Sequence, residues 1–177
     1  MDIRHALAAF AFVLALTVPA GAVTKTVPPV AADFIAAGGG PGSFSTIRAF
    51  TKIVGDNAFQ SALLQQRNRF GADDTNRFVE VFDYAISDGW KRAGQSDVSI
   101  HSDSSLQGQQ LIDALIQLGT DSGKFNSGTL FNNMFTPKVS IEIAGDIAKK
   151  YGNDAMISFY RIADGFFNSL KDTSSSG

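Results

Sequence analysis

The 177-residue chain contains no cysteine and only two histidines. Without a thiol it cannot form a disulfide, a cysteine nucleophile, a cysteine-ligated zinc or iron–sulfur site, or a covalently attached c-type haem. Its 15 basic and 17 acidic residues give a net charge of −2, so it lacks the basic surface that proteins tracking nucleic-acid phosphates carry. We therefore expect no cofactor and no nucleic-acid partner.

The N-terminus has the three regions of a signal peptide. Arg4 and His5 form a short polar start, residues 6–18 are an unbroken apolar run, and the small residues Ala20 and Ala22 suit a signal peptidase. A membrane anchor is the alternative, but the run is shorter than the roughly 20 apolar residues that span a bilayer. We expect a signal peptide over 1–22, cleaved after Ala22, a periplasmic or extracellular location, and no membrane span after cleavage.

Composition divides the rest of the chain into three parts. Residues 23–42 are rich in proline and glycine and are expected to form a flexible leader, with at most one short helical turn. Residues 43–171 are expected to form a single domain, because apolar residues recur there at helical spacing and nowhere alternate as in a half-buried strand. Residues 172–177 are expected to be a disordered tail. The fold class that follows is all-α, a compact bundle of about six or seven short helices.

Glycines and capping residues mark the expected helix boundaries. Gly55, Gly71, Gly119 and Gly152 each follow an apolar stripe and are expected to end a helix. Thr136 precedes a proline, an arrangement that favours the start of a helix. The clearest stripe lies between Gly71 and the polar segment at 94–105, and consists of Phe78, Val81, Phe82, Ala85 and Ile86. The 13 phenylalanines that remain after signal cleavage are expected to supply much of the core.

Two segments resemble each other. When 70–86 is placed over 151–167, both begin with an aromatic residue and a glycine and continue into an acidic helix start with a phenylalanine stripe. The matched positions are Phe70 and Tyr151, Gly71 and Gly152, Asp73 and Asp154, Phe78 and Phe159, Val81 and Ile162, and Asp83 and Asp164. A duplication of two helical pairs would produce this similarity. Any glycine-ended, Asp-capped helix that enters a phenylalanine-rich core would produce it too, and the sequence alone favours this simpler explanation.

Candidate catalytic groups are few. His101 is the only imidazole of the mature chain, and it lies in a polar, serine-rich segment that is typical of an exposed loop. Glu80 and Asp83 are three residues apart on an expected helix, a spacing that would let two carboxylates share one face for acid–base work. Arg77 is within one helical turn of Glu80, so ordinary ion pairing on a solvated face is the favoured interpretation. No metal site is expected.

The abundance of phenylalanine also permits an apolar groove. Phe131, Phe135, Phe166 and Phe167 are the candidate ligand-binding residues, although aromatic stripes at helical spacing usually belong to a core. The scarcity of catalytic groups favours an exported helical module that binds another protein or a small apolar ligand. The alternatives are a periplasmic hydrolase that uses carboxylates and His101, and a structural component of the envelope or matrix.

Overall fold

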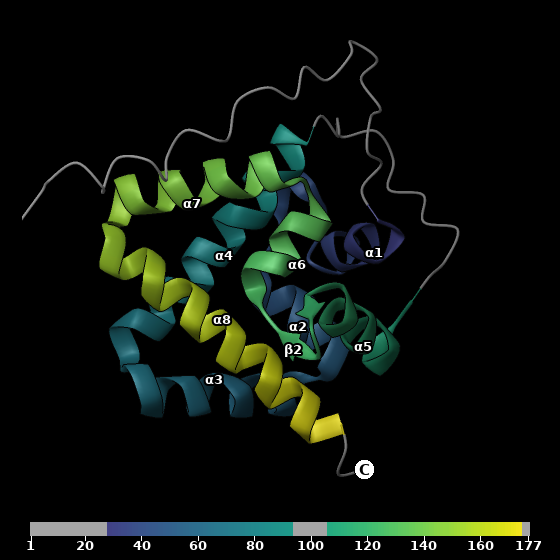
Figure 1. The fold of residues 1–177 in the computed structure, drawn as a ribbon. Coiled ribbons are helices and arrows are strands. Elements are labelled where there is room, and N and C mark those ends of the chain that lie inside the picture. Colours follow the sequence, from purple (N-terminus) through teal and green to yellow (C-terminus); the bar gives the residue numbers. More distant parts are fainter. Residues whose placement is uncertain (1–27, 94–105, 175–177) are drawn as a thin grey trace, which may run out of the picture.

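A computed structural model describes residues 28–93 and 106–174, with side chains described as far as Lys171 (Figure 1). The predicted signal peptide and His101 lie outside the described residues. The elements are α1 (Pro29–Ala37), the 3₁₀ turn η2 (Pro41–Ser43), α2 (Thr46–Val54), α3 (Asp56–Phe70), α4 (Ala72–Arg92), α5 (Gly108–Leu118), β1 (Thr120–Asp121), β2 (Lys124–Phe125), α6 (Ser127–Met134), α7 (Pro137–Tyr151) and α8 (Asn153–Ser174).

The predicted all-α class is confirmed, with eight α-helices in the described ranges in place of the expected six or seven. The additional helix is α1, which lies in the stretch that we expected to be a flexible leader. Proline at its first position suits helix initiation, and Ala31, Phe34 and Ile35 are almost fully buried. Residues 29–37 therefore belong to the domain. At the other end α8 continues to Ser174, into the stretch expected to be a disordered tail.

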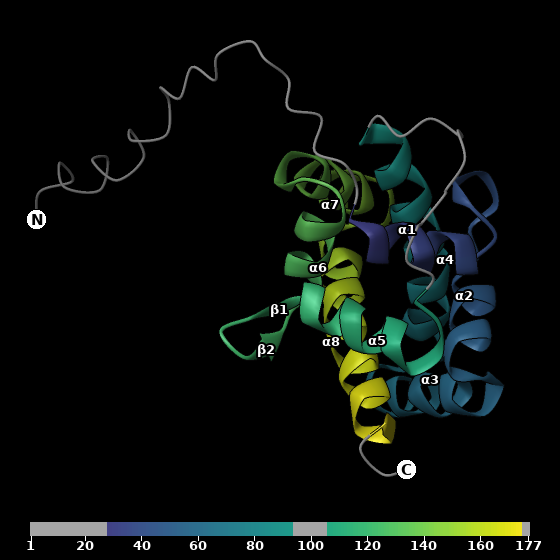
Figure 2. The ribbon, with the colours of Figure 1, turned by 90° about the vertical axis from the view of Figure 1, so that its right-hand side faces the viewer.

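The domain is built from two copies of one four-helix unit. Helix α3 spans 56–70 and α7 spans 137–151, so both of their ends are related by a shift of 81 residues. With the same shift of 81 residues, the range of α2 matches that of α6 and the range of α4 matches that of α8, to within two residues at each end. The shifted range of α1 falls within that of α5. The β1–β2 hairpin, which projects beside α5 and α6 in Figure 2, takes the place of η2. The similarity of 70–86 and 151–167 is therefore part of a longer duplication, and the simpler explanation does not account for it.

Equivalent backbone hydrogen bonds support the duplication. In the first copy Ser45 N donates to the carbonyl of Gly38 over 3.0 Å. In the second copy Asn126 N donates to the carbonyl of Gly119 over 2.9 Å. Because 45 and 126, like 38 and 119, differ by 81, the two connections are closed by equivalent hydrogen bonds, although one contains a 3₁₀ turn and the other a hairpin.

The two copies pack against each other reciprocally. Helix α3 of the first copy lies against α8 of the second, and α4 of the first lies against α7 of the second. Helix α8 runs from the end of α7 across to α3 in Figure 1, and α1 contacts α5 as α4 contacts α8. Such exchange of equivalent contacts is the pattern of a two-fold interface, here within one chain.

Aromatic rings fill the space between the copies. Phe50 lies 4.8 Å from Phe166 between ring centroids, and Phe82 lies 5.8 Å from Phe131. All four side chains are nearly inaccessible to solvent. The phenylalanines that the sequence marked as core therefore join the two copies into one core. No helix among the described residues combines the length and apolar character needed to cross a membrane.

Candidate functional site

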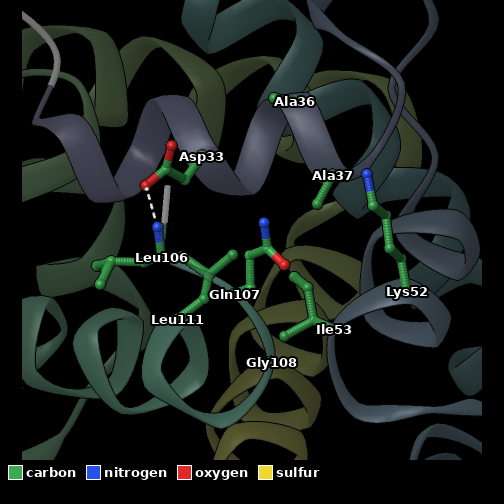
Figure 3. Close-up of a pocket in the computed structure, with 9 residues that line it drawn as sticks. All are labelled: Asp33, Ala36, Ala37, Lys52, Ile53, Leu106, Gln107, Gly108 and Leu111. Atoms are coloured by element: carbon green, nitrogen blue, oxygen red, sulfur yellow. Dashed lines mark hydrogen bonds between the residues drawn. The ribbon is translucent and has the colours of Figure 1, made fainter. Parts of the chain in front are cut away.

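A pocket of about 580 Å³ lies between α1, α2 and the start of α5 (Figure 3). Its volume falls in the range of about 300–1,000 Å³ that is usual for small-molecule sites. Its walls are polar and apolar in about equal parts, and three polar side chains contribute to them. The apolar lining residues are Ala36, Ala37, Ile53, Leu106 and Leu111, the polar ones are Asp33, Lys52 and Gln107, and Gly108 completes the wall.

Asp33 builds one wall of the pocket. It is the single charged residue of the apolar helix α1 and is only 8% exposed. Its carboxylate oxygen Oδ2 accepts a hydrogen bond from Leu106 N over 3.1 Å (Figure 3). This bond joins α1 to the residues that lead into α5, which are 73 positions away, and so positions Leu106 and Gln107 at the pocket.

Lys52 and Gln107 supply the polar groups that are open to a ligand. Within the described part of the chain neither side chain takes part in a hydrogen bond or an ion pair. In Figure 3 the Gln107 amide lies in the middle of the pocket and the Lys52 amino group stands beside Ala37. A cation and an amide beside the apolar part of a cavity can orient a ligand that carries one acceptor or anionic group.

The second copy of the unit shows which of these groups the fold itself needs. Asp33 has Ala114 at its equivalent position, and Lys52 has Asn133. The Asn133 side-chain nitrogen donates to the carbonyl of Leu118 over 2.8 Å, which fixes the end of α5. The same helix pair therefore forms without a charge at either position, so the charges at Asp33 and Lys52 are particular to the first copy.

The candidate carboxylate Asp83 holds the start of α2. Its Oδ1 atom accepts from both the backbone N and the Oγ1 hydroxyl of Thr46, each over 2.5 Å. Its counterpart Asp164 accepts from Ser127 N over 2.7 Å at the start of α6. Both contacts join residues 37 positions apart. The two aspartates thus do equivalent work, since each satisfies a backbone N–H in the first turn of a helix of its own copy.

The other candidate carboxylate, Glu80, faces a different helix. Tyr151 donates its phenolic proton to Glu80 Oε1 over 2.7 Å, and the Lys150 ammonium lies 4.7 Å from the Tyr151 ring centroid. Glu80 therefore binds the end of α7, whereas Asp83 binds the start of α2. The structure does not bring the two carboxylates together as an acid–base pair.

The four candidate groove residues lie in the core. Phe131, Phe135, Phe166 and Phe167 are each at most 2% exposed. Their rings pack on other aromatic rings, as between Phe131 and Phe135 and between Phe166 and Phe167. None of them lines the pocket in Figure 3.

An ion-pair network that the sequence analysis did not single out joins α4 to α7. Arg92 contacts the carboxylates of Asp88 and Asp146, each over 2.5 Å, and that of Glu142 over 3.4 Å. The Tyr84 hydroxyl donates to Asp88 and Asp146. Burial, together with the charges of these two carboxylates, raises the pKa of Tyr84 above 10.0. The spacing of Asp88 and Arg92 by four residues was the available sequence signal.

The described residues contain no group of three histidines or carboxylates that could hold a metal ion. In comparisons with protein families, curated proteins and solved structures, nothing matches this chain. Function is therefore argued from the geometry of the site.

Proposed function

We propose that the protein is an exported, non-catalytic helical binding module whose ligand site is the pocket between α1, α2 and α5. The observation that carries this proposal is a cavity of about 580 Å³, lined about equally by polar and apolar surface, with two polar side chains, Lys52 and Gln107, that have no partner among the described residues. Export is supported by the signal-peptide composition of residues 1–22.

The pocket defines the ligand by its chemistry. Apolar walls favour a hydrocarbon body, and the Lys52 ammonium favours an anionic end. The Gln107 amide adds a hydrogen-bond donor and an acceptor. A small amphiphile with one carboxylate, such as a medium-chain fatty acid, combines these properties.

The two other functions are less well supported. A hydrolase would need convergent catalytic groups, but Glu80 and Asp83 bind different helices and serve as structural acceptors. A structural envelope component would need a broad apolar surface patch. In the described part of the chain the exposed large hydrophobic side chains each lie on a different helix. They are Ile47, Leu64, Ile141 and Ile157.

Native mass spectrometry of the protein isolated from its source, followed by titration of the emptied protein with decanoate, tests the proposal. We expect a bound small molecule, and decanoate binding that is lost in Ala36→Trp, because Ala36 is an exposed lining residue whose enlargement fills the pocket. Lys52→Gln should weaken binding about tenfold. Gln60→Trp, an exposed position of α3 away from the pocket, is the control. Absence of any bound molecule together with no decanoate binding, or equal binding by Ala36→Trp, would overturn the proposal.

A further inference from the structure

A second cleft, of about 690 Å³, lies between the end of α3, strand β2 and α8. Its lining differs from that of the first pocket because it is mostly polar. The residues that matter for its chemistry are Arg69, Phe125, Arg161, Asp164, Gly165 and Asn168. None of them belongs to the pocket of the proposed function, so the two sites can be tested separately.

The cleft has more positive than negative side chains, with two arginines and one aspartate in its lining. Within the described residues neither Arg69 nor Arg161 has a carboxylate partner. Arg69 lies over the ring of Phe70, with its guanidinium carbon 5.1 Å from the ring centroid. The one carboxylate in the cleft is Asp164, which already accepts from Ser127 N at the positive end of α6. Two guanidinium groups therefore face one carboxylate whose charge is partly offset.

At the equivalent place in the other half of the duplication the side-chain charges are balanced, and a tyrosine side chain occupies the space. There Arg161 is replaced by Glu80 and Arg69 by Lys150, so one acid and one base take the positions of two arginines. The Glu80 carboxylate accepts from Tyr151, and the Lys150 ammonium lies between the rings of Tyr84 and Tyr151, at 5.9 Å and 4.7 Å from their centroids. The fold therefore does not need two arginines at this place.

Gly165 lines the cleft without contributing a side chain. Its counterpart is Tyr84, whose large side chain occupies the corresponding place between α4 and α7. A Cβ atom on Gly165 would lie only 2.2 Å from Oε1 of the buried Gln66. The buried Gln66 side chain thus occupies the place of a Cβ at residue 165, and no side chain projects from this position into the cleft beside the two arginines.

We propose that this cleft binds a phosphate group, either as free phosphate or as the monoester of a small molecule. Each guanidinium group presents a planar fork of N–H donors that matches the oxygen atoms of a phosphate. The Asn168 amide supplies a further donor. The half-buried ring of Phe125 offers an apolar surface to the organic part of an ester.

Calorimetric titration of the full mature chain with inorganic phosphate, phenyl phosphate and benzoate, at physiological ionic strength, tests this proposal. We expect saturable binding of the phosphate probes, with about a tenfold or greater loss of affinity in Arg161→Gln and in Arg69→Gln. Arg161→Glu, which installs the residue of the equivalent position, should abolish binding. Tighter binding of phenyl phosphate assigns the cleft to an ester, and equal binding assigns it to free phosphate.

Arg67→Gln is the matched control, because Arg67 is an exposed arginine of the same helix that does not line the cleft. It should bind phosphate as the unaltered protein does. Three results would overturn the proposal: no binding of either phosphate probe, equal binding by Arg161→Gln, or benzoate binding as tight as that of phenyl phosphate. None of these results bears on the decanoate titration, since the two sites share no residue.

Discussion

Phe78 of α4 and Phe159 of α8 occupy equivalent positions in the two halves, and their rings contact each other with centroids 5.8 Å apart. The two side chains are 1% and 2% exposed. A residue that contacts its own counterpart lies beside the axis relating the two copies. The α4–α8 contact is therefore the centre of the molecule, and both copies depend on it in the same way.

Truncation of either ring should be strongly destabilising. Phe78→Ala and Phe159→Ala should each lower the free energy of unfolding by about 3–5 kcal/mol, because each leaves a cavity in a closely packed core. Urea denaturation followed by circular dichroism measures this. Ile157→Ala, at a 45% exposed position of α8, should change stability by no more than about 0.5 kcal/mol. A loss well under 1 kcal/mol in either phenylalanine variant would contradict the central placement.

The two aspartates that hold helix starts should differ in strength. Asp83→Ala should cost about 2–3 kcal/mol because it removes the acceptor of both the N–H and the hydroxyl of Thr46. Asp164→Ala should cost about 1 kcal/mol, since within the described residues the Asp164 carboxylate accepts only from Ser127 N. Thermal unfolding of the two variants gives the comparison. Asp73→Ala, an exposed position in the first turn of α4, is the control, and an order of effects opposite to the expected one would count against these assignments.

Two equivalent glycines should be intolerant of a single methyl group. A Cβ on Gly38 would lie 2.3 Å from the ring of Phe44, and one on Gly119 would lie 2.4 Å from the ring of Phe125. Gly38→Ala and Gly119→Ala should each destabilise by about 1–3 kcal/mol. Phe44→Ala should remove the extra cost of Gly38→Ala, because the ring that would collide is then gone.

Gly145 should respond in the opposite direction. It lies within α7 with no heavy atom within 4 Å of the position of its Cβ, so Gly145→Ala should stabilise the protein by about 0.5–1 kcal/mol through helix propensity. Chemical denaturation of the glycine variants under the same conditions measures their free energies of unfolding and allows the comparison. Equal effects at Gly38 and Gly145 would show that contact with the ring is not the cause.

Stability should fall at alkaline pH in part because of Tyr84. Burial and the carboxylates of Asp88 and Asp146 raise the pKa of Tyr84 in the folded state above the value of 10.0 expected when unfolded. The stability contributed by this residue is thus complete below pH 10.0 and decreases as the pH rises through the folded pKa. Tyrosinate absorbance should show late titration of Tyr84 and of Tyr160, of which the Tyr84 part disappears in Tyr84→Phe and shifts to lower pH in Asp146→Asn.

Tyr160 provides the contrast for this titration. Burial raises its pKa as well, but no carboxylate contributes, so Asp146→Asn should leave the titration of Tyr160 unchanged. If Tyr84→Phe leaves the amount of late titration unchanged and Tyr160→Phe removes all of it, the α4–α7 network does not raise the pKa of Tyr84.

Helix positions could be predicted because local signals agree with the packing. All seven helices expected from the sequence are present, and Thr136 accepts from Val139 N as a cap should. Helix α1 was expected as no more than one short helical turn over residues 31–37, because the neighbouring prolines and glycines resemble a linker. Its stability comes from burial of Phe34 and Ile35 against the remainder of the core, which no local pattern records.

The sites could not be predicted for a related reason. The first pocket combines Asp33, Lys52 and Gln107, which only tertiary packing brings together. The one sequence signal was Asp33, a lone charge in an apolar stretch. The carboxylate candidates that the sequence offered, Asp83 and Glu80, anchor helices, so their hydrogen-bonding capacity is used within the fold.

The reciprocal packing of the copies also governs the order in which the chain can fold. Gln66 of α3 donates to Ser169 of α8, which lies 103 positions further along the sequence. Because α3 finds its partner in the last helix, the first copy cannot complete its core until nearly the whole chain has been synthesised. Helical proteins usually fold fast because their contacts are local. In this protein the contacts between α3 and α8 join residues far apart in the sequence. We therefore expect the cores of both copies to form late in folding and in one cooperative step.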